Sequence, residues 1–106
     1  MPKYLFEVSY SPEGVASLLS KGGSSRRDAL AKTAESVGGT LEAFYFAFGE
    51  HDVVSIFELP DAEAAAALAI AANATGRAQT KTTVLLTPAQ VDEAARRSVD
   101  YSAPGS

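Results

Sequence analysis

The chain contains a single histidine, and it lies in a short polar turn, Gly49-Glu50-His51-Asp52. An imidazole has an ordinary pKa of about 6.5, so a histidine beside a carboxylate can exchange a proton near neutral pH. His51 and Asp52 are therefore candidate catalytic residues for a proton transfer. The alternative is a hairpin turn without chemistry. In that case Gly49 supplies a positive φ, Asp52 bonds local backbone and the other two side chains are solvated.

A second candidate site is the run Gly22-Gly23-Ser24-Ser25-Arg26-Arg27. Glycines before a helix expose backbone N–H groups, and the helix dipole with two arginines favours an anion such as phosphate or carboxylate. The run lacks a Walker-type Lys-Ser/Thr pair and a dinucleotide fingerprint, so nucleotide binding is not indicated. Asp28 would partly neutralise the arginines. The alternative is a glycine break between two helices, with Ser24 as cap and solvated arginines.

A third candidate is Lys81, which lies among threonines in a segment with strand character. A charge inside a sheet either blocks an edge or contacts a ligand in a sheet-lined cavity, and the edge interpretation is favoured. Tyr4 and Tyr10 share a face with apolar residues and are interpreted as core or interface anchors. The candidate ligand-binding residues are Arg26, Arg27, Gly49, His51 and Lys81. No metal ligand set and no cofactor is expected.

Composition excludes several classes of protein. The 106 residues contain no Cys, which rules out disulfides, thiolate zinc sites and cysteine nucleophiles. The net charge of −4 argues against nucleic-acid binding, which needs a clustered basic face. The longest apolar segment, Ala64 to Ala72, is too short to span a bilayer, and the chain starts with a strand-like run and no leader. We therefore expect a soluble cytoplasmic protein without nucleic-acid or membrane partners.

Apolar periodicity and turn residues predict an element order of β-α-β-β-α-β. Strands are expected over 3–10, 41–48, 52–59 and 77–87. A helix capped by Ser11 is interrupted at 21–25 and resumes until Gly38-Gly39, and a second helix capped by Asp61 covers 62–75. A short helix is expected over 89–98. This order predicts an α+β, ferredoxin-like fold with a four-stranded antiparallel sheet, one domain over 1–99 and a flexible tail over 100–106.

The strand expected at 41–48 is apolar on both sides. Strict alternation places Phe44, Phe46 and Phe48 on one face and Leu41, Ala43, Tyr45 and Ala47 on the other. A strand apolar on both sides is covered on both sides, and the chain has helices enough for only one. The sequence therefore predicts that the second sheet face packs on another subunit, in a dimer or a higher even assembly.

The residues also resemble the GYD domain family. The similarity is carried by Tyr10-Ser11-Pro12-Glu13-Gly14, by Gly22 to Arg27, by Gly38-Gly39 with the strand that follows, by Phe48 to Val54, and by Arg77 with Thr80-Lys81-Thr82. His51 stands where the family name has its tyrosine. The resemblance implies a dimeric α/β-barrel assembly and no particular activity, since the family is largely without an assigned function.

Three functions are consistent with these patterns. The leading hypothesis is a small homo-oligomeric protein that binds a small molecule or a protein partner in a cleft between sheet and helices. The second is a cofactor-free oxygenase or isomerase for an aromatic or polyketide-like substrate, with His51 or Asp52 moving a proton. The third is a structural interaction module. An enzyme needs a titratable group facing a cavity beside the aromatics, a binding module needs only the cavity, and a structural module needs neither.

Overall fold

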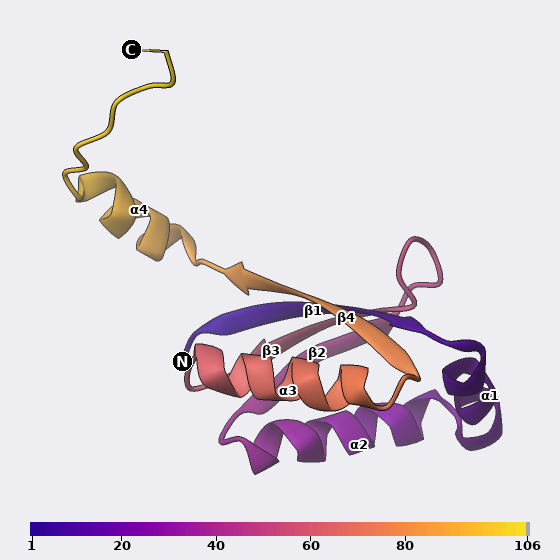
Figure 1. The fold of residues 1–106 in the computed structure, drawn as a ribbon. Coiled ribbons are helices and arrows are strands. Elements are labelled where there is room, and N and C mark those ends of the chain that lie inside the picture. The colour runs from indigo at the N-terminus through magenta and orange to yellow at the C-terminus, as the bar shows by residue number, and fades with distance from the viewer. Residues whose placement is uncertain (106) are drawn as a thin grey trace.

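Four strands form one antiparallel sheet, and helices cover one of its faces (Figure 1). The computed structural model describes residues 1–105. Its elements are β1 (Lys3–Tyr10), α1 (Pro12–Lys21), α2 (Gly23–Ser36), β2 (Thr40–Phe46), β3 (Val53–Glu58), α3 (Ala62–Ala74), β4 (Ala78–Leu85) and α4 (Pro88–Arg96). The sheet order is β2-β3-β1-β4. The predicted α+β class and the ferredoxin-like order are confirmed.

The predicted helix caps form at α1 and α3. The Ser11 hydroxyl accepts a hydrogen bond from the Gly14 N–H at 3.2 Å, and the Asp61 carboxylate accepts one from Ala64 N–H at 2.8 Å. Between α1 and α2 the break is only one residue, Gly22, with φ of 84°. The cap at Ser24 in the alternative interpretation of the glycine run is wrong, because Gly22 occupies the N-cap position of α2 and no side chain caps that helix.

A β-bulge in β2 changes which face of the sheet one residue lies on. Tyr4, Phe6 and Val8 of β1 point toward the helices and are buried. The register of β2 on β3 shifts between Leu41 and Ala43. Leu41 consequently pairs with the buried Phe57 and packs against the core, so its predicted place on the opposite face from Phe44 is wrong.

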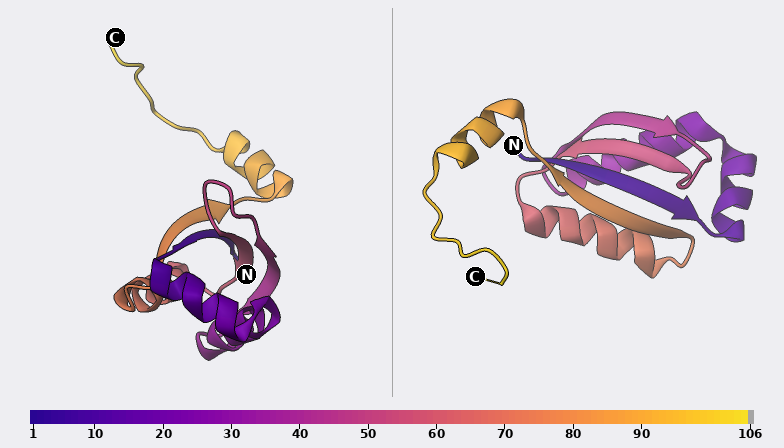
Figure 2. Two further views of the ribbon diagram at one scale, coloured as in Figure 1. Left: turned by 90° about the vertical axis from the view of Figure 1, so that its right-hand side faces the viewer. Right: turned by 90° about the horizontal axis from the view of Figure 1, so that it is seen from above.

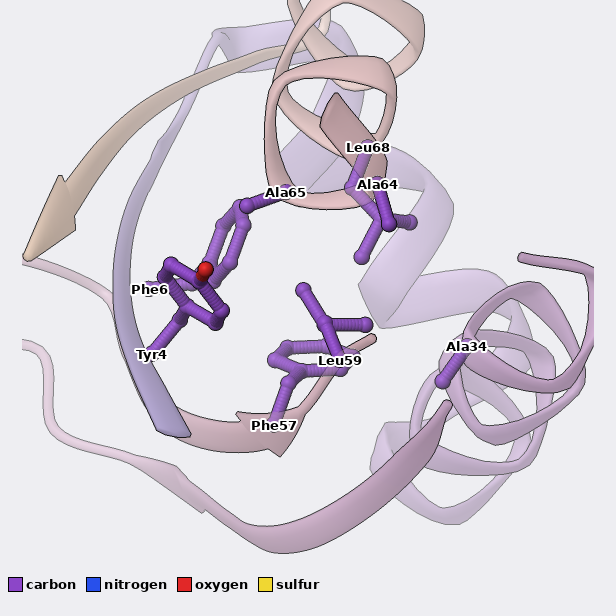
Figure 3. Packing of buried hydrophobic residues seen from close by; sticks show 8 residues of the cluster. All are labelled: Tyr4, Phe6, Ala34, Phe57, Leu59, Ala64, Ala65 and Leu68. Carbon is purple, nitrogen blue, oxygen red and sulfur yellow. The ribbon is translucent and has the colours of Figure 1, made fainter. Parts of the chain in front are cut away.

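The core lies between the sheet and α2 and α3. Figure 3 shows side chains of β1 and β3 directed toward Ala64, Ala65 and Leu68 of α3, with Ala34 of α2 beyond Leu59. The rings of Phe6 and Phe57 meet edge to face with centroids 5.1 Å apart. The alanines of α3 allow that helix to approach the sheet closely, so the larger side chains come from the strands and from Leu59.

The C-terminal arm, Leu86 to Gly105, leaves the body of the domain (Figures 1 and 2). Thr87 and Gln90 form a capping box at α4, yet no residue of this helix is buried. The radius of gyration is 16.7 Å, whereas a compact chain of this length has about 13 Å. Residues 97–105 form no helix or strand, Ser106 lies outside the described residues, and the predicted domain limit at 99 stays a prediction.

No helix among residues 1–105 is both long and apolar enough to cross a membrane.

Candidate functional site

A cleft of about 310 Å³ opens at the end of the sheet where β1 stops and β4 begins. Its walls come from α1, from the first turns of α2 and from the last turn of α3, with the adjoining ends of β1 and β4. The cations Lys21, Arg26 and Arg77 line it, and none of its lining residues is acidic. The full lining consists of Tyr10, Gly14, Ser17, Leu18, Lys21, Gly22, Ser25, Arg26, Ala29, Ala72, Thr75, Arg77 and Ala78.

Strand pairing and one close helix contact position this cleft. Tyr10 pairs with Ala78, so the segments that follow β1 and precede β4 lie side by side. The Ser11 N–H donates to the Arg77 carbonyl oxygen at 2.9 Å. A Cβ on Gly14 would lie only 2.4 Å from the same oxygen, so only glycine allows α1 to begin so near Arg77.

A second, smaller cavity of about 50 Å³ lies next to the cleft, between α2, α3 and the centre of the sheet, and we refer to it as the inner cavity. The two cavities share Tyr10, Arg26, Ala72 and Ala78. The inner one is lined by the apolar side chains Phe6, Val8, Leu30, Phe57 and Leu68. Its one buried hydroxyl, on Ser55, donates to the Phe6 carbonyl oxygen at 3.0 Å. The sheet–helix cleft therefore changes from cationic at its mouth to apolar at its base.

Tyr10 stands at the junction of the two cavities. Burial raises the pKa of its hydroxyl, against the opposing effect of the Arg26 guanidinium beside it. The hydroxyl therefore keeps its proton at neutral pH and can donate a hydrogen bond to a group in the cleft. The sequence-based assignment of Tyr10 to the core missed this position.

The turn that holds His51 lies on the open side of the sheet. His51 Nδ1 is 3.3 Å from the Ser9 hydroxyl, and its Nε2 is 3.6 Å from a Glu7 carboxylate oxygen. Lys81 is directly opposite Glu7 in the β1–β4 register. These four side chains form a polar cluster, and His51 is half-buried in it rather than solvated. Neither described cavity includes His51 or Asp52.

Three details of the predicted turn are wrong. The positive φ, 53°, belongs to Phe48 and not to Gly49, and Phe48 lies in the turn rather than in β2. The Asp52 side chain does not bond local backbone. Its carboxylate accepts a hydrogen bond from the Tyr10 N–H at 2.8 Å, and its own N–H donates to Val8 O. Asp52 thus ties the turn to the end of β1, which is a structural role beside the cleft.

The five candidate ligand-binding residues lie in different parts of the structure. Arg26 lines both cavities. Arg27 is exposed and pairs with Asp28 at 3.0 Å, the neutralisation expected from sequence. Lys81 lies on the edge strand β4, as the edge interpretation requires, and Gly49 is in the exposed turn. Arg26 alone of the five therefore reaches the cleft.

Sequence reasoning missed Lys21 and Arg77 as cleft residues. A signal for Arg77 was present, because the antiparallel pairing of β1 with β4 brings the residue before β4 next to the residue after β1. Lys21 lies next to the cleft because the break between α1 and α2 is only one residue long, at Gly22. The run of glycines in the sequence did not show how long this break would be. Among residues 1–105, no three His, Asp or Glu side chains gather in a way that could hold a metal ion.

A family model described as GYD domain matches residues 4–95, which includes the sheet, the cleft and most of α4. The chain belongs to the GYD domain family. Comparison with curated proteins and with solved structures gave no match. The placement of His51 at the tyrosine position of the family stays a prediction.

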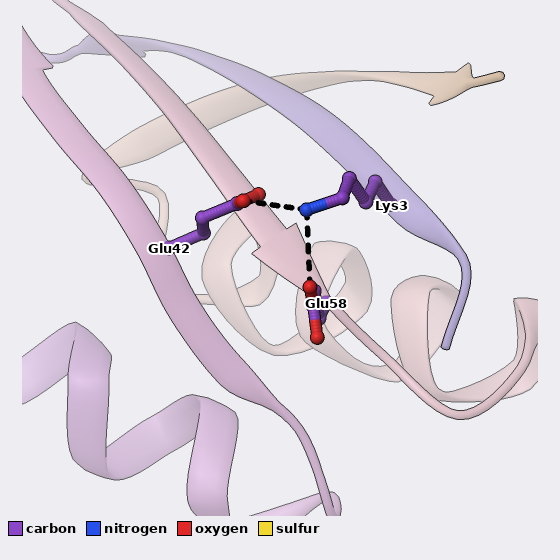
Figure 4. Close-up of polar contacts among 3 residues, drawn as sticks. All are labelled: Lys3, Glu42 and Glu58. Atoms are coloured by element: carbon purple, nitrogen blue, oxygen red, sulfur yellow. Dashed lines mark hydrogen bonds and ion pairs between the residues drawn. The ribbon is translucent and has the colours of Figure 1, made fainter. Parts of the chain in front are cut away.

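The open sheet face of this GYD domain also carries an ion-pair cluster at the start of β1. Lys3 donates to Glu42 and, at 3.0 Å, to Glu58, which brings β1, β2 and β3 together (Figure 4). The hydrogen bonds to Glu42 and then Glu58 raise the pKa of Lys3, and the hydrogen bond from Lys3 lowers the pKa of Glu58. Both shifts favour the charged pair in the folded GYD domain.

We expect Glu58→Gln to reduce the acid sensitivity of the fold. The pKa of Glu58 is lowered on folding, so its contribution is present above the ordinary value of 4.5 and is lost as pH falls through the folded value. Thermal denaturation at pH 7 and pH 3 should show a smaller difference in Tm for Glu58→Gln than for the parent protein. Glu50→Gln, in the exposed β2–β3 turn, is the control and should keep the parent difference. An unchanged difference in Glu58→Gln would contradict the assigned role of the ion pair.

Proposed function

We propose that this GYD domain binds a small molecule in the cleft between α1, α2, α3 and the sheet. The observation that supports this most is that the two cavities are adjacent and share four lining residues, since ligand sites combine an apolar lining with a few convergent polar groups. The polar groups here come from four separate elements, namely β1, α1, α2 and the α3–β4 connection. Such convergence is not needed for helix packing, and it favours a binding protein over a purely structural module.

Catalysis by His51 or Asp52 has less support than binding. A proton-transferring enzyme needs its titratable group beside the bound molecule. His51 lies on the open sheet face with Ser9 and Glu7, and the carboxylate of Asp52 is occupied by the Tyr10 N–H. The titratable side chains that face the cleft are those of Tyr10, Lys21, Arg26 and Arg77. Binding without a required proton transfer is therefore the function that the geometry supports best.

Native mass spectrometry of freshly purified protein tests the proposal. We expect a reproducible non-covalent adduct that disappears under denaturing conditions. Ala29→Trp should abolish the adduct, because Ala29 lines the outer cavity and the indole would fill it. Ala66→Trp places the same ring on an exposed position of α3 outside the cleft and should retain the adduct. Equal adduct levels in both variants would place the ligand elsewhere and overturn the proposal.

We also propose that the domain functions as a homodimer or a higher even assembly. The open sheet face carries Leu5, Val54 and Ile56 among its charged residues, and Tyr45 is 70% exposed there. The C-terminal arm adds the exposed side chains Leu86, Val91, Val99 and Tyr101. An amphipathic, well-capped helix with no buried residue gains most of its stability only from packing against a partner. A second copy supplies such a surface.

The mass of the native assembly tests the proposed oligomeric state. Light scattering coupled to size exclusion at micromolar concentration should give an even multiple of 11.0 kDa. Truncation after Leu86 removes α4 and should weaken the assembly, whereas truncation after Tyr101 removes only the last residues and should not. A monodisperse full-length monomer would contradict the proposal.

A further inference from the structure

The cleft has an ordered change of chemistry along its length, and this change restricts which molecules fit it. The outer cavity is about six times larger in volume than the inner one, with about 310 and about 50 Å³ respectively. Its cations surround a space without an acidic lining residue. The inner cavity has an apolar lining with only Tyr10, Arg26, Ser55 and Thr80 as polar members. A ligand that is polar throughout, or apolar throughout, leaves one of the two cavities poorly matched.

We infer that the ligand is an amphipathic anion, with a carboxylate or phosphate group at the mouth of the cleft and a slim apolar tail in the inner cavity. This inference rests on the proposed small-molecule binding and specifies its chemistry. The tail would pass between Tyr10 and Ala72, both of which line the two cavities. The anionic group would remain in the outer cavity, where its hydration can be partly retained.

Charge at the mouth supports the anionic head group. Arg26 reaches from the first turn of α2 into both cavities, and a guanidinium can bind a carboxylate or phosphate through two parallel hydrogen bonds. Lys21 and Arg77 also line the outer cavity and add positive charge there. Arg77 Nε is also 3.8 Å from Glu13, but both side chains are largely exposed, so this ion pair is weak and solvent-screened. The net charge around the space stays positive.

The hydrogen bonding of the buried polar side chains supports an apolar tail. Among the described residues, no buried side-chain nitrogen or oxygen lacks a hydrogen-bond partner. The Ser55 hydroxyl, which lines the inner cavity, already donates to the Phe6 carbonyl oxygen. A polar tail would lose its hydration against the apolar side chains that form most of this lining, and this is unfavourable. Contacts with Phe57 and Leu68 instead favour methylene or aromatic carbon.

Octanoate, octyl phosphate and octanamide provide a direct test, because they share one tail and differ in the head group. Their dissociation constants can be measured by titration followed in amide NMR spectra. We expect either anion to bind at least about tenfold more tightly than octanamide, a difference of about 1.4 kcal/mol. The ranking of octanoate against octyl phosphate then distinguishes a carboxylate site from a phosphate site.

Two adjacent arginines provide the matched variants. Arg26→Gln should remove the preference for the anions over octanamide, whereas Arg27→Gln should keep it, since Arg27 is exposed and paired with Asp28. For the tail, Ala72→Phe fills the junction of the cavities and should abolish the gain in affinity between butanoate and octanoate. Ala71→Phe, at the neighbouring exposed position of α3, should retain that gain.

The outcomes separate this inference from the proposed function. If octanamide binds the cleft as tightly as octanoate, or if Arg27→Gln has the same effect as Arg26→Gln, the anionic head group is wrong while small-molecule binding stands. A neutral adduct that is lost in Ala29→Trp leads to the same conclusion. If no probe shifts cleft amides and no adduct is found, both proposals fail.

Discussion

Gly14→Ala should lower the stability of the domain and open the mouth of the cleft. The new Cβ would lie 2.4 Å from the Arg77 carbonyl oxygen and 3.2 Å from Tyr10 Cβ. The first contact is with backbone, so relief requires α1 to move away from β4 and the Ser11 N–H to lose its 2.9 Å hydrogen bond to the same oxygen. Insertions of this kind into well-packed sites cost about 1–3 kcal/mol.

Thermal denaturation monitored by circular dichroism measures this effect. For a domain of this size, each 1 kcal/mol lowers Tm by roughly 4–8 °C, so the decrease should be easily resolved. Gly49→Ala is the matched control, because a Cβ there meets nothing within 4 Å and Gly49 does not adopt a positive φ. Octanoate binding should also weaken in Gly14→Ala. A Tm equal to that of Gly49→Ala would show that α1 tolerates the displacement.

Leu59→Ala should produce the second large effect. Leu59 is fully buried and lies among Tyr4, Phe57 and Ala34 in the core (Figure 3). Removing its side chain loses apolar contacts and leaves a cavity between the sheet and two helices, for which measured losses are about 2–5 kcal/mol. The backbone of Leu59 is held by its N–H donating to Pro2 O at 3.1 Å, which limits relaxation into the space.

Urea denaturation gives the free energy of unfolding of Leu59→Ala. The midpoint should fall while the slope with urea stays near the parent value. Leu19→Ala makes the same chemical change at a position 88% exposed and should alter the free energy of unfolding by less than about 0.5 kcal/mol. Equal losses of the free energy of unfolding in the two variants would mean that the core does not depend on Leu59.

The sequence defined the elements of this fold well because each has strong local determinants. Alternation identified β1, and the side chains of Ser11 and Asp61 act as the caps that their positions suggested. The β-bulge after Leu41 was not predictable, since it depends on the pairing of β2 with β3 rather than on β2 alone. One inserted residue is enough to move every earlier side chain of the strand to the other face.

The candidate site was predictable only in part, because it depends on contacts between distant segments. Arg26 was identified from local helix-start chemistry, and in the structure its side chain lines the cleft. Its neighbours Tyr10 and Arg77 become visible only through the β1–β4 register. His51 attracted attention as the single histidine, but residue type alone did not reveal that its turn faces the opposite side of the sheet from the cleft.

The alanine content of α3 has a further consequence, which concerns conformational entropy. Alanine has no rotamers to lose, so the α3 side of the outer cavity, which is formed by Ala72, orders at almost no side-chain entropy cost and cannot change shape by rotamer exchange. Adjustment to molecules of different size would then come from α1 and α2, whose long side chains Lys21 and Arg26 line the same cavity on either side of Gly22 in the chain. If the proposed binding function holds, ligand selectivity would be divided between these two walls.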